Sequence, residues 1–261
     1  MRLIDARSEA AGWDGLSQSQ ELALQLFDGF RLRVDARTVE VPGTVQRLLA
    51  FLALRPDATR EVAAGTLWSE VDEAKAGACL RSTLWRVNKA SKLVLARGQN
   101  RLALADCVLI DFRDWTAAAS AYLDEPGAER PVSLRGPPWA GELLPGWYDD
   151  WVLVERERMR QLHLHVLDTM SIRLTSQGRY ATALDAALMA IRLEPLRESA
   201  QRNVVRVHLA EGNISEAIRA YENYRRLLHL ELGVPPSGML RSLIAPYYRQ
   251  VRTDPPVAAS R

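Results

Sequence analysis

The sequence contains little cysteine and little histidine, and neither type is arranged as a metal or catalytic site. Cys79 and Cys107 are the two cysteines in 261 residues, and their spacing fits neither a CxxC pair nor a disulfide framework. His163 and His165 are two residues apart on a predicted helix and therefore point in different directions. No Ser/His/Asp or Cys/His arrangement can be drawn from the sequence. We therefore expect no catalytic residues, no metal and no cofactor.

Long apolar runs are also missing, and no segment approaches the roughly 18 residues that a membrane span needs. The N-terminal residues lack the apolar core of a secretory signal. These features favour a cytoplasmic protein with no membrane partner. Apolar residues make up 48% of the chain, charged residues 25%, and the net charge is +2. This composition is typical of a globular protein, and the length suits two compact domains.

The first third of the chain shows a change from strand to helix periodicity. Apolar residues alternate between 21 and 42 with turn residues between the runs, which predicts a small antiparallel meander. Thr44 is a candidate cap for a helix that ends before Pro56. Thr59 is a candidate cap for a second helix, with Val62, Ala63 and Leu67 pointing inward and Trp68 at its end.

A third helix and a hairpin follow these elements. The helix is expected from Ala76 to about Ser91, and residues 93–96 and 102–105 flank a loop that predicts a hairpin. A last apolar run covers residues 108–110. The order of strands, three helices and hairpin favours a winged helix-turn-helix.

Acidic residues are missing between Glu73 and Asp106, although the protein as a whole is almost neutral. The same stretch holds seven basic residues: Lys75, Arg81, Arg86, Lys89, Lys92, Arg97 and Arg101. Such a surface attracts phosphates through counterion release, whatever the DNA sequence.

A helical wheel separates two faces of the third helix. Leu80, Thr83, Leu84, Val87 and Ser91 fall on a side suited to packing, and Arg81, Ser82, Trp85, Arg86 and Lys89 fall mostly opposite. A helix of this kind fits a DNA major groove, where Arg pairs with guanine and where Lys and Ser contact phosphates. The alternatives are a solvated helix face with chance clustering of charge and, for Trp85, a role in covering a neighbouring helix.

Two similar segments recur in the second half of the chain with a spacing of 34 residues. The matching pairs are Gly178 and Gly212, Tyr180 and Ile214, Ala183 and Ala217, and Ala187 and Tyr221. This is the tetratricopeptide period, and Pro195 follows the first unit where that repeat ends. Since two units are few, we expect helices at 149–175 and 237–251 to cap them. This repeat type is a scaffold for binding other protein chains, although the stack can also be merely structural.

The predicted fold is therefore mainly α with a small β part: a winged helix-turn-helix followed by an all-α tetratricopeptide-like domain. The predicted division is an extension at 1–20, a DNA-binding domain at 21–115, a helical domain at 116–252 and a tail at 253–261. A connection rich in proline and glycine covers residues 124–146.

Residues 21–252 resemble the SARP family of antibiotic-pathway regulators in actinobacteria. Residues 79–86 (CLRSTLWR) and 101–104 (RLAL) are similar to its OmpR-type winged helix. Residues 141–151 (GELLPGWYDDW), 155–158 (ERER) and 232–237 (LGVPPS) are similar to parts of its bacterial transcriptional activation domain. Asn88 and Lys89 stand where the family commonly has further arginine, so the base preference cannot be carried over.

The resemblance implies an activator of a secondary-metabolite gene cluster that binds direct repeats in double-stranded promoter DNA. It also implies contact with RNA polymerase, often with the sigma factor, a second copy on the adjacent DNA repeat, and a short-form member without a nucleotide-binding domain. The DNA-binding residues that we predict are Arg81, Ser82, Trp85, Arg86, Lys89, Lys92, Arg97, Asn100 and Arg101. The alternative function is a tetratricopeptide-type adaptor whose winged helix does not bind DNA or is gated by a ligand near residues 137–147.

Overall fold

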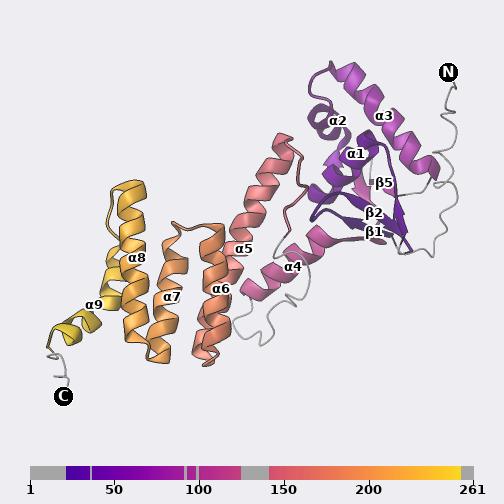
Figure 1. The fold of residues 1–261 in the computed structure, drawn as a ribbon. Helices are drawn as coiled ribbons and strands as arrows, with labels where there is room; N and C mark the ends of the chain where they lie inside the picture. Colours follow the sequence, from indigo (N-terminus) through magenta and orange to yellow (C-terminus); the bar gives the residue numbers. More distant parts are fainter. Residues whose placement is uncertain (1–21, 36, 91–92, 98–99, 125–140, 254–261) are drawn as a thin grey trace, which may run out of the picture. The chain divides into compact units, whose positions relative to one another are not determined.

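The computed structural model of the chain describes residues 22–35, 37–90, 93–97, 100–124 and 141–253. Contacts divide the chain into an N-terminal unit (1–121 and 132–159) and a repeat unit (122–131 and 160–261). Figure 1 shows strands and helices together in the first unit and successive antiparallel helices in the second. The predicted extension at 1–20 and most of the predicted connection at 124–146 lie outside the described residues.

A four-stranded sheet forms one part of the N-terminal unit. Strands β1 (Leu22–Gln25), β2 (Arg31–Val34) and β3 (Arg37–Val39) form the predicted antiparallel meander. Strand β7 (Val108–Ile110) adds to the free side of β1 in parallel, which gives the order β3-β2-β1-β7. The meander prediction did not include this fourth strand, because β7 lies more than 80 residues along the chain from its partner.

Helix α1 (Gly43–Leu54) is almost entirely buried, from Leu48 to Leu54 without interruption. The predicted cap Thr44 is wrong, because the helix already includes Thr44 and Pro42 is at the N-cap position without a side-chain hydrogen bond. Proline suits the start of a helix, where no backbone donor is required.

Helix α2 (Arg60–Leu67) starts at the predicted cap, where the Thr59 hydroxyl oxygen accepts a hydrogen bond from the Val62 amide at 3.3 Å. Ala63 and Leu67 are buried as predicted. Val62 is 47% exposed, so its predicted inward position is wrong. The buried stripe passes through Ala64 instead, one turn before Leu67.

Helix α3 (Glu73–Ala90) begins three residues before the predicted start. Asp72 caps it, because its carboxylate accepts a hydrogen bond from the Lys75 amide at 2.9 Å. The predicted hairpin is present as β5 (Val94–Arg97) and β6 (Arg101–Leu104). A two-residue strand β4 (Ala58–Thr59), which the sequence did not predict, pairs with β6 immediately before α2.

Asp111, the first residue of α4 (Asp111–Asp124), joins β1 to the start of this helix. Its carboxylate accepts hydrogen bonds from the amides of Leu26 at 2.9 and 3.0 Å, Phe27 at 3.1 Å and Phe112 at 2.7 Å. Burial raises the pKa of this carboxyl group above its ordinary value, and the three amide donors oppose the shift. The edge of Trp115 packs against Phe27 at a centroid distance of 6.4 Å.

The segment before α5 (Asp150–Ser176) runs along the end of β1. Leu143 forms an antiparallel bridge with Phe27, and the Leu144 amide donates to the Leu26 carbonyl at 2.9 Å. Both leucines are buried. By these contacts the first residues of the predicted activation domain belong to the core of the N-terminal unit.

Arg156 on α5 holds this segment in place through four interactions. Its guanidinium donates to the carbonyls of Leu143 at 3.1 Å, Leu144 at 2.8 Å and Trp147 at 3.1 Å. It also pairs with the Glu142 carboxylate at 3.0 Å. The planar, forked donor set of arginine suits several acceptors at once, which lysine cannot match.

The repeat unit contains the helical elements that the 34-residue period predicted. Gly178 and Gly212, with φ of +73° and +87°, form the turns between helices, where a side chain would be strained. The paired positions Ala183 and Ala217 are fully buried and let the helices approach closely. The helices are α6 (Tyr180–Leu193), α7 (Glu198–Glu211), α8 (Ile214–Leu232) and α9 (Gly238–Thr253).

Two polar contacts tie the capping segments to α7. Asp168 of α5 accepts hydrogen bonds from Arg197 at 3.0 Å, Ser199 at 2.7 Å and Asn203 at 3.0 Å. Between α7 and the second capping helix α9, Glu198 accepts a hydrogen bond from the Ser237 amide at 2.8 Å. The serine of the LGVPPS segment thus connects α7 to the start of α9.

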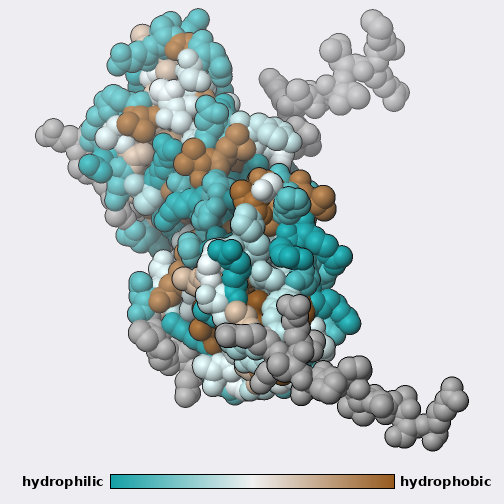
Figure 2. Space-filling view, turned by 90° about the vertical axis from the view of Figure 1, so that its left-hand side faces the viewer, coloured by the Kyte–Doolittle hydropathy of each residue, from teal (hydrophilic) through white to brown (hydrophobic). Residues whose placement is uncertain are grey.

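The surface of the molecule is mainly hydrophilic on the face drawn in Figure 2, where apolar side chains gather in patches. Among the residues that the structure describes, no helix is both long enough and apolar enough to cross a membrane. Within the same residues, no group of three or more His, Cys, Asp or Glu side chains is placed to hold a metal ion.

Replacing Asp111 with alanine is expected to lower the free energy of unfolding by about 2–4 kcal/mol, because three amide groups lose their acceptor away from bulk water. Urea denaturation followed by tryptophan fluorescence measures this change. Asp114→Ala is the control, since Asp114 lies on the same helix turn and is exposed. Equal stability of the two variants would contradict the role assigned to Asp111.

His163 gives a pH-dependent prediction, because burial lowers its pKa from 6.5 to about 4. Below pH 6.5 the unfolded chain takes up a proton that the folded chain does not, so stability is present above this pH and is lost towards pH 4. Between pH 7 and pH 5 this group alone should cost roughly 2 kcal/mol. His163→Gln should reduce the acid sensitivity of the urea midpoint, whereas His229→Gln, at an exposed position, should leave it unchanged.

Candidate nucleic-acid interface

One side of α3 is fixed by the core of the N-terminal unit. Leu80, Thr83, Leu84 and Val87 are buried, and α3 contacts both α1 and α2. The hydroxyl group of Thr83 donates to the Cys79 carbonyl at 2.9 Å, so this polar group is satisfied inside the helix packing. The helical wheel placed the four buried residues on the packing side of the helix. The fifth residue predicted on that side, Ser91, lies outside the described residues.

The opposite side of α3 carries the exposed basic face, which consists of Arg81, Ser82, Trp85, Arg86 and Lys89. All five residues are exposed, and Trp85 has 64% of its surface accessible. The alternative that Trp85 covers a neighbouring helix therefore does not fit. Within the described residues, no hydrogen bond or ion pair engages Arg81 or Arg86.

Trp85 and Lys89 interact with each other on this face. The Lys89 ammonium lies 5.3 Å from the centre of the Trp85 ring, within the range of a cation–π contact. Their spacing of four residues places them one helical turn apart. The contact orients a flat aromatic surface beside positive charge, an arrangement suited to a phosphate–sugar backbone.

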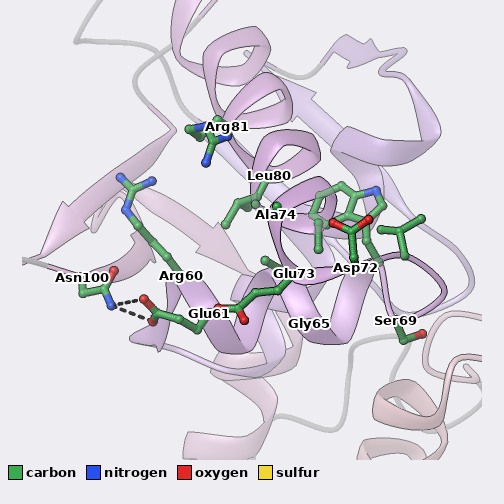
Figure 3. Close-up of a pocket in the computed structure, with 15 residues that line it drawn as sticks. Arg60, Glu61, Gly65, Ser69, Asp72, Glu73, Ala74, Leu80, Arg81 and Asn100 are labelled. Atoms are coloured by element: carbon green, nitrogen blue, oxygen red, sulfur yellow. Dashed lines mark hydrogen bonds between the residues drawn. The ribbon is translucent and has the colours of Figure 1, made fainter.

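A groove of about 1140 Å³ lies between α2 and α3, next to the basic face (Figure 3). Arg60 lines it from the start of α2, and Arg81 lines it from α3. A Cβ atom at Gly77 would lie 3.3 Å from the Arg81 guanidinium, so the glycine leaves room for that side chain. The opposite part of the groove is acidic, with Asp72 and Glu73 at the helix turn.

The sequence pattern did not indicate Arg60, because this residue lies before the segment without acidic residues. The signal was present, because Arg60 directly follows the helix-capping Thr59. The first turn of a helix directs free amide groups and a partial positive charge outward, and this favours phosphate.

The loop end of the hairpin is anchored beside the same groove. The Arg101 guanidinium donates to the Asp57 carbonyl at 3.1 Å, and the Asn100 side-chain amide donates to both carboxylate oxygens of Glu61 at 2.6 Å. The hydrogen bond from Asn100 lowers the pKa of Glu61, so the carboxylate stays charged. Asn100 and Arg101 are both exposed.

Two of the predicted DNA-binding residues, Lys92 and Arg97, are described only in part or not at all. Lys92 lies outside the described residues, and of Arg97 the backbone is described, opposite Arg101 in the hairpin. The structure thus brings together Arg81, Ser82, Trp85, Arg86 and Lys89 on one helix face. Asn100 and Arg101 lie at the loop end of the hairpin, where Asn100 lines the groove.

Comparison with known proteins places the second half of the chain in a named family. Residues 137–246 match the Bacterial transcriptional activator domain. The chain is also 28% identical over 240 residues to the Regulatory protein AfsR of Streptomyces coelicolor. This alignment covers 86% of the chain but 24% of AfsR, so the chain spans about a quarter of that relative.

A solved structure supports the fold. EmbR of Mycobacterium tuberculosis, determined in complex with a low affinity phosphopeptide, matches with a TM-score of 0.64 at 19% identity. The match covers 88% of this chain and 66% of the EmbR chain. The winged helix followed by helical repeats is therefore an arrangement shared with EmbR. Residues 137–246 therefore contain a Bacterial transcriptional activator domain, and the chain as a whole is similar to AfsR in sequence and to EmbR in fold.

Proposed function

We propose that the protein is a sequence-specific DNA-binding transcriptional activator in which α3 reads bases in the major groove. The observation that carries this proposal is the exposed basic face, which lies opposite the buried side of α3. An isolated helix face of this width fits the major groove of B-form DNA. Arg81 and Arg86 are the candidates for bidentate contacts with guanine, and Ser82 and Lys89 are candidates for phosphate contacts.

The hairpin supplies the second contact with DNA in this proposal. Arg97 and Arg101 stand opposite each other in β5 and β6. A hairpin with this charge at its loop end can hold the phosphate backbone or the adjacent minor groove, while α3 reads the major groove. Lys92, which precedes the hairpin in sequence, is included as a phosphate contact on its charge alone.

The repeat unit is proposed to provide the surface for RNA polymerase, with the sigma factor as the expected subunit. Helical repeats of this period serve as scaffolds for other chains, and the family match covers this part of the sequence. We further propose a second copy on an adjacent direct repeat of the promoter, a cytoplasmic location, and control of a secondary-metabolite gene cluster. The resemblance of the sequence to the SARP family supports these expectations.

Arg81→Ala should weaken binding to the specific promoter by about 10- to 100-fold and change binding to a scrambled duplex much less, because a bidentate base contact discriminates by about 1–3 kcal/mol. Fluorescence anisotropy with promoter fragments of neighbouring genes measures both affinities. Arg219→Ala is the control, as Arg219 is an exposed arginine of the repeat unit. If the wild-type protein binds neither duplex even at low salt, a protein-interaction adaptor becomes the better proposal.

Arg101→Ala should weaken binding to both duplexes by similar factors, since a backbone contact carries no sequence information. The slope of the logarithm of affinity against the logarithm of salt concentration should become shallower by about 0.9. Titrations at several salt concentrations give this slope. A selective loss of binding to the specific promoter would instead place Arg101 on a base.

A further inference from the structure

The loop end of the hairpin is held to the neighbouring elements by few contacts. Strand β4 offers two residues for pairing with β6, Ala58 opposite Leu102 and Thr59 opposite Arg101. Just beyond this pairing, the Arg60 amide donates to the Asn100 carbonyl at 2.9 Å. Asn100 directly precedes β6, so these contacts tie the loop end of the hairpin to β4 and α2.

The side chain of Asn100 adds a contact of a different kind. Its amide nitrogen lies 2.6 Å from both carboxylate oxygens of Glu61, as the dashed lines in Figure 3 show. Hydrogen bonds to an ionised group are stronger than those between neutral groups. Glu61 is the second residue of α2, so the contact joins the hairpin to the first turn of the helix-turn-helix.

The position of Glu61 is unexpected for a surface that contacts DNA. It lines the groove together with Arg60 and Arg81, where an acidic group repels phosphates. By charge alone, removal of Glu61 should therefore increase the affinity for DNA. If Glu61 instead holds Asn100 in place, its removal should lower the affinity for DNA. The direction of the change in affinity therefore distinguishes the two roles.

We propose that Glu61 and Asn100 form a hairpin lock, in which Asn100 positions the hairpin through Glu61 instead of contacting DNA itself. The inference rests on the proposed function and makes both residues positioning residues. Without the lock, this end of the hairpin is still held by the two β4–β6 pairs, by the Arg60 amide and by the hydrogen bond from Arg101 to the Asp57 carbonyl. The side chain of Asn100 is then no longer fixed, and Asn100 and Arg101 are positioned less firmly. Ordering these two residues on DNA then costs conformational entropy that the locked hairpin has already lost.

The test compares Glu61→Ala, Asn100→Ala, the double variant and Glu61→Gln by fluorescence anisotropy on the specific promoter. Glu61→Ala and Asn100→Ala should each weaken binding by about three- to tenfold, and the double variant should bind no more weakly than either one. Glu61→Gln keeps one acceptor oxygen for Asn100, so it should bind more tightly than Glu61→Ala.

Glu70→Ala is the matched control, since Glu70 is an exposed acidic residue in the segment between α2 and α3, and the carboxylate that binds the Asn100 side chain is that of Glu61. Its removal should leave the affinity unchanged or slightly increase it. Unfolding temperatures of all variants should stay within about 2 °C of the wild type, which shows that the loss is one of positioning and not of folding.

The lock is contradicted if Glu61→Ala increases the affinity as Glu70→Ala does, or if the two single losses add in the double variant. Additive losses would mean that Asn100 contacts DNA independently of Glu61. These outcomes leave the proposed function intact, because the wild-type protein still binds the promoter. Absence of binding by the wild-type protein would overturn both.

Discussion

The packing of α3 against the core of the N-terminal unit is the constraint on which the proposed DNA interface depends. A helix turns by about 100° per residue, so burying Leu80, Leu84 and Val87 determines which positions face solvent. Arg81 and Arg86 are exposed for this reason and not because of any contact of their own. A change that rotated the helix by one residue would remove the basic face without altering a single charge.

A second constraint is long-range hydrogen bonding to the end of β1. Asp111 binds the amides of Leu26 and Phe27 from α4, while the segment at 142–144 pairs with the same residues and is held by Arg156. These contacts explain the GELLPGWYDDW segment physically: its backbone completes the N-terminal unit, and ERER supplies the arginine that fixes it. The sequence resemblance in this segment therefore reflects packing within the N-terminal unit as well as membership of the activation domain.

Patterns among residues close in sequence predicted most helices and strands. The elements and contacts that were not predicted depend on partners distant in sequence. The alternation of apolar residues, the Thr59 cap and the 34-residue period are patterns of residues that are close in sequence or recur at a fixed spacing. A single sequence therefore contains them. Strands β4 and β7 and the bond from Asn100 to Glu61 join positions about 40 to 85 residues apart, which no periodicity reports. Asn100 was predicted as a DNA contact from its place between Arg97 and Arg101, where only the folded hairpin shows its amide already engaged.

Selection of DNA from a pool of random duplexes by the purified protein tests most directly whether α3 reads bases. The pool requires no knowledge of the natural promoter, and sequencing of the bound fraction reports specificity without reference to affinity. We predict enrichment of a short motif, present in two direct copies whose centres are separated by whole helical turns of about 10–10.5 base pairs. A bound fraction with the same sequence composition as the starting pool would contradict it.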